Sequence, residues 1–209
     1  MKTIVIAGAS GLIGRAIYER LTPIAERVYG IDIGPDTNFQ CNITRSSHLK
    51  NVLDTIGPIH GFVNATYPPS IYTHMEAFMV ATQMLAEHMI SGSIVNIASI
   101  YGVSGHRPRL YDGTDMDSNP GYHFVKGGII SATKNWAVRY APHVRVNCIS
   151  PGGVFDKQPK SFVDRYQSET PLGRMATPDD IAGPVAFLLG DDSRYITGQN
   201  IVVDGGFTL

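Results

Sequence analysis

The sequence predicts an α/β fold: a doubly wound, Rossmann-type parallel sheet of about seven strands in a single domain over residues 1–209. Two observations predict this class. Short runs rich in β-branched residues alternate along the whole chain with longer segments of helical periodicity. The first of these runs is followed directly by a glycine-rich turn, which is typical of sheets that bind dinucleotides. A chain of this length can also bury one substantial core.

The composition favours a small molecule as the partner. Seventeen basic and eighteen acidic residues give a formal net charge of -1, so nothing recommends nucleic acid or a membrane surface as a partner. The start of the chain leaves no room for a signal peptide, and no apolar run is long enough to span a bilayer, so a cytoplasmic protein is expected. Cys41 and Cys148 are expected to be reduced, buried thiols, although sequence alone leaves a disulfide between them open.

The first strand, residues 4–7, leads into a glycine turn and then into a helix over residues 15–21. Glycine lets the backbone approach a pyrophosphate, and a helix N-terminus offers free amide groups and the positive end of a dipole. We therefore expect a phosphate-binding turn made by Gly8, Ser10, Gly11, Leu12, Ile13 and Gly14.

Asp32 stands at the carboxyl end of the second strand, residues 27–31. A carboxylate there accepts hydrogen bonds from the adenosine ribose hydroxyls and repels a 2′-phosphate. Residues 33–37 contain no arginine or lysine that would attract such a phosphate. NAD is thus favoured over NADP. The alternative is that Asp32 merely starts a turn with Gly34 and Pro35.

The middle of the chain predicts three more strands. Residues 33–38 are too few for a crossover helix, so a loop leads to a third strand over residues 39–43. Ile33, Asn42 and Ile43 are expected beside the cofactor. A helix over residues 45–56 precedes the fourth strand, 59–63, after which Asn64, Ala65 and Thr66 are further expected cofactor contacts. A helix over residues 73–89 then leads to the fifth strand, 93–98.

The second half predicts two irregular segments between regular elements. Residues 102–120 form an excursion over the active-site mouth. A helix over 121–140 and a strand over 144–149 follow, and Pro151 with Gly152 ends that strand. Residues 153–172 are irregular and polar, a candidate lid. Thr177 and Pro178 begin a helix over 179–189, and residues 201–203 are the seventh strand.

Ser99, Tyr122 and Lys126 carry the groups needed for acid/base chemistry on an alcohol. Positions four apart lie on one face of a helix, so Lys126 can reach the surroundings of Tyr122. An ammonium there is expected to lower the pKa of the tyrosine from its usual value near 10, which would make Tyr122 an acid/base near neutral pH. In isolation, a packed tyrosine beside a solvated lysine is the alternative.

The chain resembles the short-chain dehydrogenase/reductase family over nearly its whole length. The segments that carry the resemblance are residues 8–14, 96–99, the Tyr122 to Lys126 spacing, 146–153, 171–174 and 196–206. The resemblance implies that Ser99 binds the reacting oxygen, that Tyr122 is the acid/base and that Lys126 holds the nicotinamide ribose. It also implies that Pro151, Gly152 and Val154 surround the carboxamide, and that helices 73–89 and 121–140 pair into homodimers or homotetramers.

Several positions depart from the family pattern. His74 falls near the place of an asparagine that many members use in a proton relay, although a helix-surface histidine is the safer interpretation. Asp156 stands where a threonine is usual. The excursion is longer than in most members and contains His106, Arg107 and Arg109, a mixture suited to sugar hydroxyls and a phosphate. It resembles oxidoreductases of surface-polysaccharide and flagellin-glycan synthesis, although a merely solvated loop is equally compatible.

These observations favour an NAD-dependent oxidoreductase that interconverts a secondary alcohol and a ketone, on a sugar or sugar-phosphate-like substrate. The first alternative is a dehydrogenase of a steroid-like or other apolar alcohol. The second is a cofactor-binding regulator without turnover, for which the altered segment 64–67 is the only support. The seven histidines form no metal-ligand spacing, so no metal site is expected.

Overall fold

A single parallel sheet occupies the centre of the computed structural model, which describes residues 2–209. Its seven strands run in the order β3-β2-β1-β4-β5-β6-β7. The bounds are β1 Thr3–Ala7, β2 Arg27–Asp32, β3 Phe39–Gln40, β4 Gly61–Asn64, β5 Gly92–Ile97, β6 Val144–Pro151 and β7 Asn200–Val203. The order reverses between β1 and β4, which is the switch point where open parallel sheets bind ligands. The predicted fold class is therefore confirmed.

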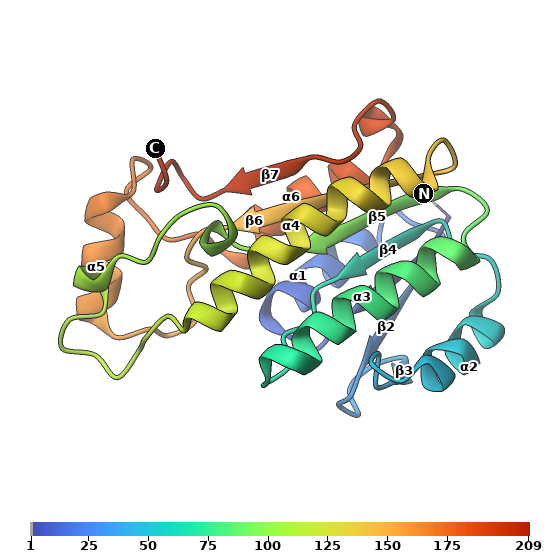
Figure 1. Cartoon of the computed structure of the whole chain (residues 1–209), viewed down its shortest axis with the longest axis horizontal. Helices are drawn as coiled ribbons and strands as arrows, with labels where there is room; N and C mark the ends of the chain where they lie inside the picture. The colour runs from blue at the N-terminus through green and yellow to red at the C-terminus, as the bar shows by residue number, and fades with distance from the viewer. Residues whose placement is uncertain (1) are drawn as a thin grey trace.

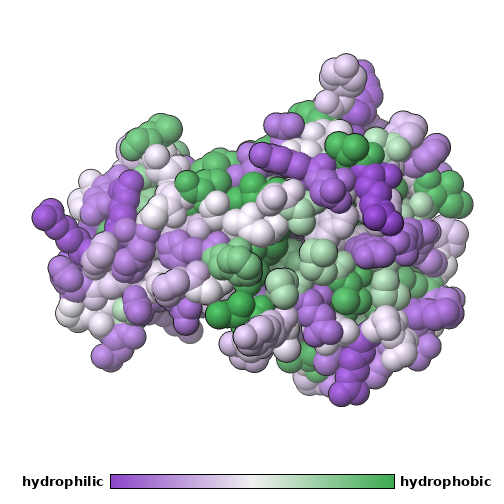
Figure 2. Space-filling view, viewed as in Figure 1, coloured by the Kyte–Doolittle hydropathy of each residue, from purple (hydrophilic) through white to green (hydrophobic). Residues whose placement is uncertain are grey.

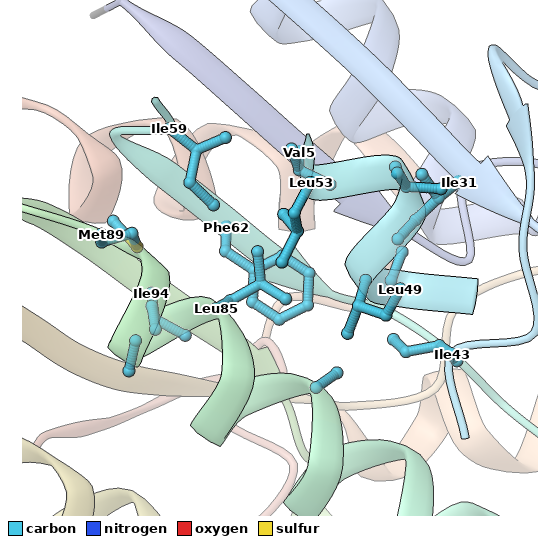
Figure 3. Packing of buried hydrophobic residues seen from close by; sticks show 14 of the residues in the cluster. Val5, Ile31, Ile43, Leu49, Leu53, Ile59, Phe62, Leu85, Met89 and Ile94 are labelled. Carbon is cyan, nitrogen blue, oxygen red and sulfur yellow. The ribbon is translucent and has the colours of Figure 1, made fainter. Parts of the chain in front are cut away.

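Helices cover both faces of this sheet (Figure 1). They are α1 Leu12–Leu21, α2 Ser46–Ile56, α3 Ile71–His88, α4 Pro120–Tyr140, α5 Lys160–Glu169 and α6 Pro178–Leu189, with short 3-10 turns η1 Ile100–Gly102, η2 Pro108–Leu110 and η3 Asp191–Ser193. The two-residue period of a strand divides β1 between the faces: Val5 packs with α2, α3 and α4, whereas Ile4 and Ile6 pack with α1 and α6. Figure 3 shows the first of these cores, where Phe62 lies among Leu49, Leu53 and Leu85.

Two predictions about local structure need correction. The third strand is two residues long, because β2 ends at Asp32 and only Phe39 and Gln40 pair with it. The candidate lid is also not irregular throughout, since it contains α5. That helix buries only Phe162 and Tyr166, and the rest of its surface is polar or partly exposed, so its apolar pattern is sparse.

The two segments that the sequence predicts as an excursion and a lid share a small core of their own. Leu110 from the excursion packs with Phe162 and Tyr166 of α5, and Phe207 near the C-terminus joins them. These parts lie together at one end of the molecule (Figure 1), and Figure 2 shows that the outer surface there is largely hydrophilic. The segments are thus one packed unit beside the sheet.

Two further features concern the cysteines and the possibility of a membrane-spanning helix. Cys41 and Cys148 are free and buried, so the expectation of unpaired thiols is met. Among residues 2–209, no helix combines the length and apolar character needed to cross a bilayer.

Candidate active site

The turn between β1 and α1 is shaped for close approach of a ligand's phosphates. Gly8 has φ of +79°, and a Cβ there would lie 2.6 Å from the carbonyl oxygen of Ala65. The amide of Gly11 turns back to the carbonyl oxygen of Gly8 over 3.1 Å, and α1 begins at the next residue. A turn that only glycine can adopt, next to a helix N-terminus, fits a pyrophosphate.

A cavity of about 700 Å³ opens above this turn. A volume of this size suits a bound cofactor. Among the predicted cofactor contacts, the lining contains Gly8, Ser10, Gly11, Leu12, Ile13, Gly14, Asp32, Ile33, Asn42, Ile43, Ala65 and Thr66. It also contains Tyr67, Pro68, Pro69, Ser70 and Thr73, which are not among the predicted contacts. The proline pair directly after a buried strand was the available signal for that wall.

Asp32 lies at the end of β2 with its carboxylate facing the glycine turn. One of its oxygens, Oδ2, accepts hydrogen bonds from the Ser10 hydroxyl over 2.5 Å and from the Ser10 amide over 3.1 Å. The other oxygen, Oδ1, accepts the amide of Ile33 over 2.7 Å. The structure therefore holds the Asp32 carboxylate at the rim of the cavity. If Asp32 only started a turn with Gly34 and Pro35, its hydrogen bonds to Ser10 would have no explanation.

Asn64 does not line the cavity, in contrast to its neighbours Ala65 and Thr66. It is fully buried, donates to the carbonyl oxygen of Ala77 over 3.3 Å and accepts the hydroxyl of Thr66 over 2.8 Å. The side chain thus ties the end of β4 to α3 and orients Thr66. A direct contact of Asn64 with a cofactor stays a prediction.

Ser99, Tyr122 and Lys126 come together at the carboxyl end of β5. The Lys126 ammonium donates to the carbonyl oxygen of Ile97 over 2.8 Å and lies 5.6 Å from the centre of the Tyr122 ring. Ser99 Oγ accepts the amide of Tyr101 over 3.1 Å, and the Ser99 side chain also interacts with the Tyr122 hydroxyl. The helical spacing of four places Tyr122 and Lys126 on one face of α4, as predicted.

The expected effect of Lys126 on the pKa of Tyr122 is not what the structure shows. Burial raises the pKa of Tyr122. The interaction with the Ser99 side chain lowers this pKa, but by less than burial raises it. Burial also lowers the pKa of Lys126 itself to about 7, so the ammonium is only partly charged at neutral pH. The sequence could not reveal this, because both shifts depend on how deeply α4 packs against the sheet.

His74 is not on the helix surface, which corrects the safer of the two interpretations. It is 3% exposed, and its ring centroid lies 5.3 Å from that of Tyr67 and 6.4 Å from that of Tyr122. Burial, assisted by the charge of Lys126, lowers the pKa of His74 to about 3, so the imidazole is neutral. Its Nε2 is buried with no hydrogen-bond partner among the described residues.

The turn after β6 brings Pro151, Gly152 and Val154 to the same edge of the sheet. The amide of Gly152 donates to the carbonyl oxygen of Val203 over 2.9 Å, and Val154 forms a bridge with Ala176. Asp156 is exposed, and its amide donates to Gln158 Oε1 over 2.7 Å. The Asp156 side chain is therefore exposed at the position where the family pattern has a threonine.

The excursion contributes aromatic and histidine side chains, and one of its two arginines is tied down. Arg107 pairs with Glu169 over 2.9 Å and donates to the carbonyl oxygen of Phe207 over 2.9 Å, so it is not free for a phosphate. The Tyr101 and Tyr111 hydroxyls hydrogen-bond to each other, and the Tyr101 ring lies 6.3 Å from that of Tyr122. Among the described residues, no group of three or more histidine, cysteine, aspartate or glutamate side chains is placed to hold a metal ion.

Taken together, a glycine turn at the switch point of a parallel sheet and a tyrosine-lysine pair at the same edge define a dinucleotide-binding oxidoreductase domain. Comparison with known proteins agrees. A family model described as enoyl-(acyl carrier protein) reductase matches residues 65–208. The post-translational flagellin modification protein A of Campylobacter coli is 28% identical and aligns with all of this chain and 98% of that protein. The chain belongs to the short-chain dehydrogenase/reductase family, whose members are oxidoreductases that act on CH–OH groups and use NAD or NADP.

Two solved structures are similar over the whole chain. A short-chain dehydrogenase from Leptospira borgpetersenii with bound NAD+ is 31% identical with a TM-score of 0.84, and the match covers 100% of this chain and 93% of that one. The aldohexose dehydrogenase of Thermoplasma acidophilum is 26% identical with a TM-score of 0.82, and the match covers 99% and 94% of the two chains.

Proposed function

We propose that the chain is an NAD-dependent oxidoreductase that interconverts a secondary alcohol and a ketone by hydride transfer, with Tyr122 as the acid/base. The observation that carries the proposal is the convergence of Ser99, Tyr122 and Lys126 at the edge of the sheet where the glycine turn opens. When bound, an oxidised nicotinamide accepts hydride and brings a positive charge that favours tyrosinate. That charge acts against the burial that raises the pKa of Tyr122.

Each of the three residues has a separate task in this proposal. Tyr122 takes the proton from the alcohol in oxidation and returns it in reduction. Ser99 donates its hydroxyl proton to the reacting oxygen, in place of its contact with the Tyr122 hydroxyl in the free protein. Lys126 holds the nicotinamide ribose and, with a pKa near 7, exchanges protons readily at neutral pH.

His74 belongs to the proposed route by which the proton leaves the site. Its neutral ring can both donate and accept, and its Nε2 is the buried nitrogen without a partner near Tyr122. The buried position supports a relay role in place of the usual asparagine. A histidine on the surface would not support it.

NAD is the proposed cofactor because Asp32 is fixed at the rim of the cavity. A carboxylate whose oxygens already face the Ser10 hydroxyl can exchange that bond for a ribose hydroxyl, whereas a 2′-phosphate would meet a like charge. The related structure with bound NAD+ supports the same choice for this chain.

The proposed substrate is a small polyhydroxylated alcohol such as a sugar. Tyr101 stands near Tyr122 and hydrogen-bonds to Tyr111 of the excursion, whose ring stacks on His106. Aromatic faces with hydroxyl groups suit a sugar ring. The likeness to the aldohexose dehydrogenase and to the flagellin modification protein supports this class. A sugar phosphate has less support than the sequence suggested, since one of the two candidate arginines, Arg107, is already paired with Glu169, whereas Arg109 is exposed.

A panel of alcohols with NAD+ tests the proposal through the fluorescence of NADH. We expect turnover with aldoses or related polyols and little with steroid-like alcohols. Turnover confined to apolar alcohols would favour the first alternative. Tight NAD+ binding without turnover on any member of the panel would favour the non-catalytic regulator.

A further inference from the structure

A single buried tyrosine holds the backbone turn after β6. The amide N–H of Gly153 donates to the hydroxyl oxygen of Tyr166 over 2.6 Å, and the carbonyl oxygen of Gly153 accepts the amide of Ala176 over 2.9 Å. Tyr166 is 3% exposed. Both polar groups of Gly153 are therefore bound by residues that follow it in the chain, and the shape of the turn depends on them.

The tyrosine ring packs against this turn so closely that only glycine fits. A Cβ on Gly153 would lie 2.8 Å from carbons of the Tyr166 ring, and a Cβ on Gly152 would lie 2.8 Å from the Tyr166 hydroxyl oxygen. Contacts this short would force the turn or the ring to shift. The two glycines and the ring are thus matched in shape.

The ring of Tyr166 is itself held in place by the C-terminal segment and the excursion. Phe207 stacks on it with 4.3 Å between ring centroids and 3° between planes. The guanidinium of Arg107 lies 4.2 Å from the centre of the Phe207 ring and also pairs with Glu169 at the end of α5. The C-terminus, α5 and the excursion lie together in Figure 1. Three distant parts of the chain therefore fix one hydroxyl group.

We propose that Tyr166 is a positioning residue that keeps the turn at Gly152 and Gly153 in the shape that receives the nicotinamide half of the cofactor, with Phe207 locking its ring. The inference rests on the proposed function. The proposal is favoured because Asp156, at the position where the family pattern has a threonine, is exposed. The backbone of the turn then makes more of the contact with the cofactor. Without the Tyr166 hydroxyl, the turn samples other shapes, so a smaller fraction of the protein is competent to bind NAD+. The apparent dissociation constant for NAD+ rises as a result.

Calorimetric binding of NAD+ and of ADP-ribose to Tyr166→Phe tests this proposal without relying on activity. ADP-ribose keeps the adenosine, the pyrophosphate and the second ribose of the cofactor and lacks only the nicotinamide. We expect ADP-ribose to bind within about twofold of wild type and NAD+ to bind about five- to tenfold more weakly, the range of one lost hydrogen bond. A general loss of structure would weaken both ligands alike.

A matched control and a second variant keep the test decisive. Tyr140→Phe also removes a buried hydroxyl, at the far end of α4, and should leave both affinities unchanged. Phe207→Leu keeps the packing apolar but removes the stacked ring, and should weaken NAD+ by about two- to fivefold with ADP-ribose unchanged. If Tyr166→Phe does not fold, Phe207→Leu decides the matter. An unchanged NAD+ to ADP-ribose ratio in a folded variant overturns the proposal.

Failure of the proposed function looks different in the same experiment. If wild type binds neither ligand, or binds NAD+ no better than ADP-ribose, the nicotinamide site itself is refuted. If wild type prefers NAD+ and turns over substrate while Tyr166→Phe keeps that preference, only the role of Tyr166 is refuted.

Discussion

Burial determines the protonation of the side chains around Tyr122. It raises the pKa of Tyr122, lowers that of Lys126 to about 7 and lowers that of His74 to about 3. All three groups are consequently held toward their neutral forms in the free protein. A site of this kind responds strongly to any positive charge placed in it, which is the property that a tyrosine acid/base requires.

Replacing Asp32 tests the cofactor preference at a single residue. Asp32→Ala removes the acceptor for the ribose hydroxyls and the charge that opposes a 2′-phosphate, so we expect the preference for NAD over NADP to fall by about tenfold or more. The ratio of kcat/KM for the two cofactors measures it. An unchanged ratio would remove the reason for naming NAD.

Replacing His74 tests its buried, neutral state. Its pKa is 6.5 in an unperturbed chain and about 3 in the fold, so below pH 6.5 the unfolded chain binds a proton that the native chain does not. Stability is therefore lost as pH falls from about 6.5 toward 3, by up to about 1.4 kcal/mol per pH unit. In His74→Phe this loss should be smaller. Urea unfolding at pH 7.5 and pH 5 measures it, with the exposed His48→Phe as control.

Equal pH dependence in His74→Phe and wild type would contradict the buried assignment. The effect of the same variant on turnover is separate, because a relay role predicts slower proton release even where the fold is intact. His74→Asn, which keeps a donor and an acceptor, should retain more activity than His74→Phe.

Among the elements, the excursion and α5 show most clearly where sequence reasoning reached its limit. The strands and the glycine turn follow from local patterns, so the sheet and the cofactor edge were predictable. The contacts of Arg107 with Glu169 and Phe207 join positions far apart in the chain, and no local pattern encodes them. The same holds for Tyr166, whose partner Gly153 lies in the preceding turn, and for the buried face that His74 takes on α3.

Loosening the unit formed by the excursion and α5 should leave the sheet intact. Arg107→Ala removes the ion pair with Glu169, the bond to the Phe207 carbonyl and the contact with its ring. We expect about 1 kcal/mol lower stability and faster amide hydrogen exchange confined to residues 102–120 and α5. Hydrogen exchange with mass spectrometry measures it. Arg109→Ala, an exposed neighbour, should change neither. Uniformly faster exchange over the sheet would contradict a local unit.

At the scale of the whole molecule, one face carries a stripe of exposed apolar side chains. Ile71, Met75 and Met79 recur every four residues on α3 and are 39%, 44% and 47% exposed, and Phe124 on α4 is 71% exposed. In Figure 1 these two helices lie in front of the sheet, and Figure 2 shows hydrophobic residues between hydrophilic ones on the same face. We propose that copies of the chain pair through this face, as the homodimer or homotetramer that the family resemblance implies would require.

A charge on this face should separate the subunits. Met79→Lys places an ammonium in the apolar stripe, where pairing would bury it without a partner. We expect the sedimentation coefficient to fall to that of a monomer. Ile24→Lys, an equally exposed apolar position beyond the end of α1, should leave the assembly unchanged. A wild-type protein that sediments as a monomer would contradict the proposed assembly.

In the proposed function, the folded chain transfers hydride between NAD and an alcohol with Tyr122 as the acid/base. The most direct test compares wild type with Tyr122→Phe at saturating NAD+ and the best alcohol of the panel. NADH formation should fall by at least about a hundredfold, the usual contribution of an acid/base, while calorimetry shows NAD+ binding within about threefold of wild type. Turnover that survives in Tyr122→Phe would contradict the account.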